Sequence, residues 1–176
     1  MISEKKCFDL TRKVKILIGQ TEIDKDYFIN LIDKNIGDLD YKTNVKGKMT
    51  NWSLFNKDEK FHQFLESINE DMYWANKFKQ PLYLKDSWGN KLKKGDSVEE
   101  HEHASERLSG ILHLTDNGPG TYFPEIDLNI KETCGKYIIF DSTLLHEVKE
   151  NNTDKTRYTI AFNFSGKNSW DPDPNV

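Results

Sequence analysis

The sequence has few cysteines and no long apolar segment, and each shortage excludes a class of protein. Its two cysteines, Cys7 and Cys134, lie far apart among 176 residues, so they do not make the disulfide framework of a small secreted domain. No apolar run approaches the roughly 20 residues that a membrane-spanning helix needs, and residues 1–6 lack the apolar core of a signal peptide. We therefore expect a cytoplasmic protein, in the host cytoplasm if the source is viral, with reduced cysteines and no membrane partner.

Positive charge is not in excess either. Lys and Arg total 25 against 29 acidic residues, which gives a net charge of −4 and does not favour nucleic acid as a partner. The hydrophobic share of 36% is high enough for a folded domain with a core. We expect one domain over residues 1–176, as a monomer or a homodimer, with helical support at about 20–80, a β core at about 81–166 and an irregular tail at 167–176.

Helical periodicity is confined to the first half of the chain. A β-rich strand at 13–19 precedes Asp24, which is typical of a helix N-cap, and Gly37 is typical of a helix end. Residues 38–57 have no clear period, and we expect a loop with room for one strand. A second helix is predicted over 58–78 because apolar residues recur there on one stripe. The stripe consists of Phe61, Phe64, Leu65, Ile68 and Met72, extended by Trp74, Ala75 and Phe78.

After Pro81 the pattern changes to short β-like runs separated by turn residues such as Gly89-Asn90 and Gly95-Asp96. Many short strands at this spacing predict an antiparallel sandwich or barrel, which the N-terminal helices would support on one face. The predicted strands are 82–88, 97–103, 108–114, 121–124, 136–141, 145–149 and 156–165.

Three of the five histidines are spaced like metal ligands. His101 and His103 are two residues apart, so on a strand their imidazoles point to the same face, and His146 could close the site from a neighbouring strand. Imidazole suits Fe, Zn, Cu and Ni, and three ligands on one face leave positions open, as in catalytic sites. The alternative is a set of surface histidines beside glutamates. Residues 38–57 and 89–100 flank these strands and are expected to form the rim of a substrate site.

Arg157 lies on the last predicted strand and shares a face with Thr159. An inward arginine near a metal needs an anion, because an unpaired buried charge is costly. A guanidinium matches a carboxylate in two parallel hydrogen bonds, to which a hydroxyl can add a third. The pair therefore predicts a carboxylate site, and the alternative is an exposed arginine paired with Glu147 or Glu150.

In this order the motifs resemble the 2-oxoglutarate- and Fe(II)-dependent dioxygenase superfamily, and within it the small oxygenases common in marine phages and bacteria. The match covers about residues 82–165. The residues that carry it are Trp88, Asn90, His101, His103, Ser109-Gly110-Ile111-Leu112, Gly135 to His146, and Arg157-Tyr158-Thr159.

The resemblance implies a mainly β fold, a double-stranded β-helix (a jelly roll or cupin-like barrel) buttressed by N-terminal α-helices, with one Fe(II) bound by His146 among others. Arg157 would bind the far carboxylate of 2-oxoglutarate, assisted by Thr159. Prolyl-hydroxylase-like members line this pocket with a hydroxyl residue and, four positions later, a tyrosine. Ser109 and His113 match those positions, with histidine in place of tyrosine. The implied reaction uses O2 to hydroxylate an unidentified substrate, a protein side chain or a small molecule, and releases succinate and CO2.

One position departs from the superfamily pattern, which usually combines two histidines with an acid in H-x-D or H-x-E. Here His103 stands where the acid belongs, and Glu102 could replace it only through a register slip or a bulge. Two alternatives therefore stay open. One is a cupin with a three-histidine metal site, a dioxygenase or isomerase without 2-oxoglutarate, whose pattern Gly95, H-x-H and Glu106 match loosely. The other is a barrel that binds metal without catalysis.

Overall fold

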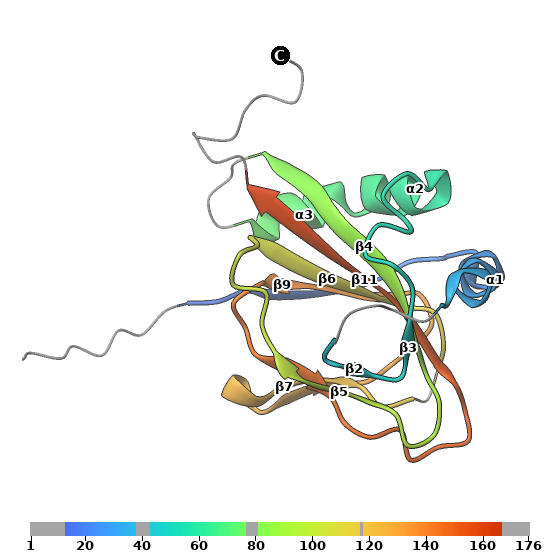
Figure 1. Ribbon diagram of the computed structural model, residues 1–176. Coiled ribbons are helices and arrows are strands. Elements are labelled where there is room, and N and C mark those ends of the chain that lie inside the picture. Colours follow the sequence, from blue (N-terminus) through green and yellow to red (C-terminus); the bar gives the residue numbers. More distant parts are fainter. Residues whose placement is uncertain (1–12, 38–42, 77–80, 117, 167–176) are drawn as a thin grey trace, which may run out of the picture.

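The computed structural model describes residues 13–37, 43–76, 81–116 and 118–166, and its strands form two antiparallel sheets (Figure 1). The larger sheet has the order β1-β9-β6-β11-β4-β3, and the smaller sheet has the order β2-β5-β10-β7-β8. From β4 to β11 the chain alternates between the two sheets, apart from the β7–β8 hairpin, which confirms the predicted double-stranded β-helix. The strands are β1 (Ile16–Gln20), β2 (Val45–Lys46), β3 (Lys48–Met49), β4 (Leu82–Leu92), β5 (Ser97–His101), β6 (Leu108–His113), β7 (Thr121–Phe123), β8 (Leu128–Ile130), β9 (Lys136–Asp141), β10 (His146–Val148) and β11 (Arg157–Gly166).

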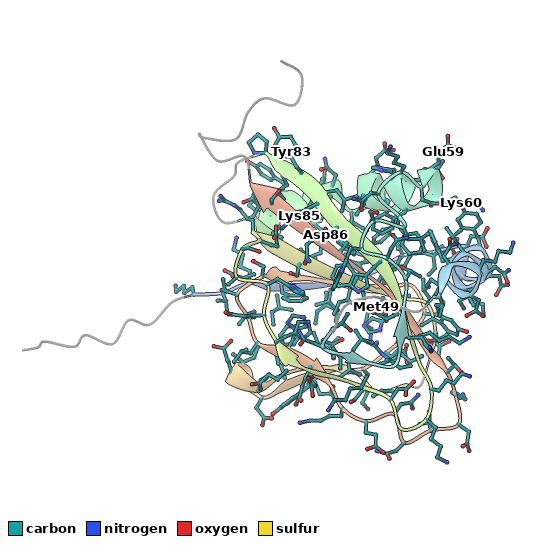
Figure 2. The ribbon with its side chains drawn as sticks, in the orientation of Figure 1. Met49, Glu59, Lys60, Tyr83, Lys85 and Asp86 are labelled. Carbon is teal, nitrogen blue, oxygen red and sulfur yellow. The ribbon has the colours of Figure 1, made fainter. Side chains whose placement is uncertain are left out.

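Three helices, α1 (Lys25–Asn35), α2 (Glu59–Ser67) and α3 (Asn69–Ala75), pack on the outer face of the larger sheet (Figure 1). Glu59 and Lys60 lie on the outer side of α2, away from the sheet (Figure 2). The helices thus buttress the β-helix as expected. The helices and the sheet share one apolar core, which includes Phe28, Ile32, Phe61, Phe64, Leu65, Met72, Leu112, Tyr137, Ile139, Ile160 and Phe162.

Two local features determine how α1 begins and how closely it packs. The Asp24 carboxylate accepts a hydrogen bond from the Tyr27 backbone N–H at 3.1 Å, so Asp24 is the N-cap, as predicted. Gly89 lies in β4 beneath this helix, where an added Cβ would be 2.3 Å from Cγ1 of Ile32. The prediction of a turn at Gly89-Asn90 is therefore wrong, because this glycine permits close helix–sheet packing inside a continuous strand.

The helix predicted over 58–78 is two helices in the structure. The Ser67 hydroxyl donates to the backbone carbonyl three residues earlier at 2.7 Å, which competes with the helical pattern, and Ile68 (φ −108°, ψ 12°) separates α2 from α3. Because α3 starts with a new rotation, Trp74 is 62% exposed and its predicted place on the apolar stripe is wrong. Phe78 lies outside the described residues.

Several strand boundaries also differ from the prediction. The strand expected at 97–103 ends at His101, and two short strands, β2 and β3, occupy part of 38–57. The hairpin partner β8 was not predicted, because three residues after the 3-10 turn Pro124–Ile126 are too few to show a period. The tail 167–176 and Cys7 lie outside the described residues. Cys134 forms no disulfide with any of the described residues.

A second apolar cluster lies between the two sheets, and polar side chains occupy the rest of the space between them. The cluster consists of Ile111, Phe123, Ile130, Ile138, Phe140 and Leu144.

None of the helices in the described ranges is both long and apolar enough to cross a membrane.

Candidate functional site

Three histidine side chains meet in a cavity between the sheets. His101 ends β5, His146 begins β10, and their Cα atoms are paired across the two strands. The ring centroids of His101 and His146 are 4.3 Å apart, and that of His103 lies 4.9 Å from the first and 5.4 Å from the second. Each residue offers one ring nitrogen, and the three nitrogens lie within 4.8 Å of one another. The structure therefore brings the three predicted histidines together.

His103 reaches this cluster from a turn rather than from a strand. Its backbone N–H donates to the Ser142 carbonyl at 2.8 Å, and its own carbonyl accepts from the Glu106 N–H at 2.8 Å. The period-two argument is therefore wrong for His103, although its ring does join the other two. Glu102, the alternative at this position, is exposed and does not belong to the cluster.

Backbone carbonyls orient two of the rings. Nδ1 of His101 lies 2.7 Å from the Glu99 carbonyl, and Nδ1 of His146 lies 3.0 Å from the Leu144 carbonyl. Because a carbonyl only accepts, each Nδ1 carries the proton and each Nε2 keeps its lone pair. Such second-sphere bonds are what fix the tautomer of a metal-binding histidine.

The three rings are neutral at pH 7. Burial, followed by the neighbouring His101, lowers the pKa of His146 to about 3 and that of His103 to about 4. Burial also lowers the pKa of His101. Neutral imidazole is the form that binds a metal ion.

The histidines open into a cavity of about 500 Å³, its mouth included. Val45 and Val98, from the two segments expected to form the substrate rim, also line it. Six of the seven predicted site residues line this one cavity: His101, His103, His146, Ser109, Arg157 and Thr159.

Arg157 lies inside the protein, with 2% of its surface exposed. Its Nε donates to the Pro119 carbonyl at 3.1 Å, and its Nη1 lies 3.4 Å from the Thr159 hydroxyl. The nearest acid is Glu132, whose Oε1 is 3.8 Å from Nε. The alternative of an exposed arginine paired with Glu147 or Glu150 is therefore wrong.

A ring contact followed by a chain of hydrogen bonds connects the histidine end of the cavity with Arg157. The Trp88 ring lies 6.1 Å from the His103 ring, and its Nε1 donates to Oδ1 of Asn90 at 3.1 Å. Nδ2 of Asn90 then donates to the Thr159 hydroxyl at 3.4 Å. Trp88 and Asn90, which the resemblance singled out, thus hold Thr159 beside Arg157.

Ser109 and His113 both lie on the inner face of β6. The Ser109 hydroxyl donates to Oδ1 of Asn163 at 2.8 Å and faces the cavity. His113 lies deeper, with 0% exposure, and is paired with Thr159 across β6 and β11. Burial lowers the pKa of His113 to about 4.

Two buried acids near the site gave no clear sequence signal. Glu132 follows the unpredicted strand β8, and no repeat or spacing marks it. In the sequence, Glu106 matches only the loose cupin pattern. In the structure its side chain is 3% exposed, pairs with Lys85 and leaves Oε2 without a hydrogen-bond partner among the described residues. Lys85 and Asp86 are neighbours on β4 (Figure 2). Burial raises the pKa of Asp86 and the charge of Glu106 adds to this, whereas the same charge only partly opposes the burial that lowers the pKa of His103.

Solved structures share this fold. A viral collagen prolyl hydroxylase from Paramecium Bursaria Chlorella virus-1, in complex with 2-oxoglutarate, is 16% identical, with a TM-score of 0.67 over 87% of this chain and 96% of that one. A prolyl-4-hydroxylase from Pseudomonas putida is 14% identical, with a TM-score of 0.65 over 87% and 93%. HygX from Streptomyces hygroscopicus, with nickel and 2-oxoglutarate bound, is 12% identical, with a TM-score of 0.66 over 86% and 83%.

At these identities the likeness shows the fold alone: the chain has the double-stranded β-helix of 2-oxoglutarate/Fe(II) oxygenases. No protein-family model and no curated protein matches the sequence.

Proposed function

We propose that the protein is an Fe(II)- and 2-oxoglutarate-dependent oxygenase that hydroxylates a protein side chain or a small molecule. The observation that carries the proposal is one cavity with three convergent imidazoles and a buried guanidinium. Either feature alone has other uses, whereas a metal site beside a carboxylate site fits a 2-oxo dicarboxylate.

The histidine cluster suits a divalent metal ion. Nitrogens bound to one ion at about 2.1 Å lie about 3 to 4 Å apart, so nitrogens within 4.8 Å need only small side-chain rotations to converge. His101, His103 and His146 would be the ligands, and the remaining positions would stay open for the co-substrate and O2. Bound iron would supply the oxidative decarboxylation of 2-oxoglutarate to succinate and CO2 and the transfer of oxygen to substrate.

Arg157 suits the distal carboxylate of the co-substrate. Its Nε is used by the Pro119 carbonyl, which orients the guanidinium toward the Thr159 hydroxyl. A carboxylate there would receive charge-assisted bonds from Arg157 and one bond from Thr159. Ser109 and His113 would complete this pocket on the β6 side.

Metal and co-substrate binding can be tested without turnover. We expect calorimetry to detect one Mn(II), used as an air-stable substitute for Fe(II), and 2-oxoglutarate to raise the melting temperature further once Mn(II) is bound. His146→Ala should abolish metal binding because it removes a ligand, whereas Glu102→Ala, the matched control at an exposed neighbour, should leave it unchanged. Succinate formation after anaerobic loading with Fe(II) then tests the reaction itself.

A three-histidine cupin-type enzyme is the second candidate, because no acid joins the cluster within the described residues. Such an enzyme has no need of Arg157. If saturating 2-oxoglutarate leaves the melting temperature of the metal-bound protein unchanged, this candidate replaces the first. Metal binding without succinate formation for any substrate would favour the non-catalytic barrel.

A further inference from the structure

A buried carboxylate lies beside the guanidinium that the proposed co-substrate needs. The Glu132 side chain is 0% exposed, and its Oε1 is 3.8 Å from Nε of Arg157. It accepts hydrogen bonds from the Thr115 hydroxyl at 2.8 Å and from the Gly118 N–H at 2.6 Å. A Cβ on residue 118 would lie 2.0 Å from Oε2, so glycine there allows the backbone to approach the acid. Glu132 is thus built into the protein as an acceptor that balances the charge of Arg157.

His113 is the unsatisfied member of this group. It is fully buried, yet neither ring nitrogen has a hydrogen-bond partner among the described residues. Nδ1 lies 3.9 Å from Oε1 of Glu132, which is too long for a hydrogen bond. Buried polar groups are rarely left unpaired in a native protein. An unpartnered imidazole next to Thr159 and Glu132 therefore indicates a missing ligand or proton.

We propose that 2-oxoglutarate binds together with one proton, which His113 takes from solvent, and that the resulting imidazolium is the second cation for the distal carboxylate. The inference rests on the proposed function. Nδ1–H of the protonated ring would face Glu132, 3.9 Å away, and Nε2–H would donate to the distal carboxylate beside Thr159, the residue paired with His113 across β6 and β11.

The charge count explains why the proton is needed. Without ligand, Arg157 and Glu132 cancel. The distal carboxylate adds a second negative charge next to one guanidinium in a buried space, where an unbalanced charge is costly. Protonation of His113 restores balance, because both of its nitrogens then donate.

The other charged groups facing His113 do not supply this proton. Besides Arg157 and Glu132, only Lys136 of β9 among the described residues acts on the His113 ring, and it opposes protonation. Its ammonium is engaged by the Lys131 carbonyl at 2.6 Å. In the free protein burial keeps the pKa of His113 near 4, so the ring begins neutral at pH 7 and can take up a full proton.

The test counts protons by calorimetry. The Mn(II)-loaded protein is titrated with 2-oxoglutarate in buffers of different ionisation enthalpy between pH 6 and 8. If one proton is taken up per ligand bound, the affinity for 2-oxoglutarate should fall close to tenfold for each unit by which the pH rises. The matched ligand is 2-oxopentanoate, which keeps the metal-chelating end and replaces the distal carboxylate with a methyl group. 2-Oxopentanoate should bind without this proton, and its affinity should not depend on pH. Because both ligands chelate the metal in the same way, any protons exchanged at the metal cancel when the two proton counts are compared.

Three variants assign the proton, and a fourth, Thr159→Ser, is their control. His113→Gln and His113→Phe cannot take it up, so both should bind 2-oxoglutarate with no pH slope. Glu132→Gln removes the competing charge and should bind more tightly than the parent at pH 8, again with little proton uptake. Thr159→Ser keeps every charge and should retain the uptake of the parent.

The outcomes separate this inference from the proposed function. Equal proton counts for the two ligands, or proton uptake that persists in His113→Gln and His113→Phe, would overturn the role of His113 while leaving an oxygenase in place. Failure of the Mn(II)-loaded protein to bind 2-oxoglutarate anywhere from pH 6 to 8 would overturn the proposed function, and this inference with it.

Discussion

Arg157 can be tested by a substitution that separates co-substrate binding from stability. Two charge-assisted hydrogen bonds to a carboxylate contribute about 1.5–3 kcal/mol each, so removing the guanidinium should weaken 2-oxoglutarate binding at least about 100-fold at 1.4 kcal/mol per decade. Arg157→Met alone also leaves Glu132 buried without its cation 3.8 Å away. Losing one partner of a buried pair costs about 3–5 kcal/mol of folding free energy, which could be mistaken for lost binding.

The informative variant is therefore the double substitution Arg157→Met with Glu132→Gln. It removes both charges, so we expect most of the stability lost in the single variant to return while 2-oxoglutarate binding stays weak. Arg157→Lys keeps a charge without the planar fork, so its affinity for 2-oxoglutarate should fall between that of the parent and that of the double variant. Urea unfolding measures the stability. Calorimetry measures the affinity of the metal-free proteins for Mn(II) and then the affinity of the Mn(II)-loaded proteins for 2-oxoglutarate. A double variant that binds 2-oxoglutarate within threefold of the parent, with Mn(II) affinity intact, would refute the assignment of Arg157.

Three further predictions concern packing, pH and the metal. Gly89→Val would bring a side chain against Ile32 and should lower the free energy of unfolding by about 1–3 kcal/mol, whereas Gly37→Ala, where nothing lies within 4 Å of the new Cβ, should change it little in the same urea titration. The pKa of His146 is about 3 in the folded protein and about 6.5 when unfolded. The unfolded chain therefore binds more protons between these values, and the metal-free protein should lose stability as the pH falls from about 6.5 toward 3. A His146→Phe variant with an equally steep loss would contradict this. His103→Asp restores a carboxylate to the metal site and should tighten Mn(II) binding measured by calorimetry; weaker binding would argue against His103 as a ligand.

Much of the site could be predicted because its residues lie on regular strands. Arg157 and Thr159 point to the same face by the period of two, and the structure places both inside. His101 and His146 sit at the ends of adjacent strands, where pairing alone brings them together. In each case a local pattern determines the direction of the side chain, and the sheet does the rest.

The remaining features depend on contacts that a single sequence does not display. Glu132 belongs to the site only because the turn at Gly118 folds onto it, and that contact joins segments with no shared period. His103 reaches the cluster through a turn whose hydrogen bond to Ser142 is tertiary. The sequence wrongly predicts a turn at Gly89, because a glycine that allows a helix to pack closely cannot be distinguished there from a glycine that bends the chain.

The pairing of β11, which keeps one register with β4 from Arg157 to Asn163, restricts how the length of this protein can change. Arg157 and Thr159 face the cavity, while the alternate positions Ile160 and Phe162 belong to the core beneath the helices. Deleting a single residue inside this strand would turn the cavity face toward the helices and the core face toward the cavity, which would abolish folding and ligand binding in one step. In the connection at 149–156, which precedes the strand, Asn151 is fully buried and bonded to Leu92 and Asp96, so drift in length is expected to accumulate only in the part of this connection after Asn151.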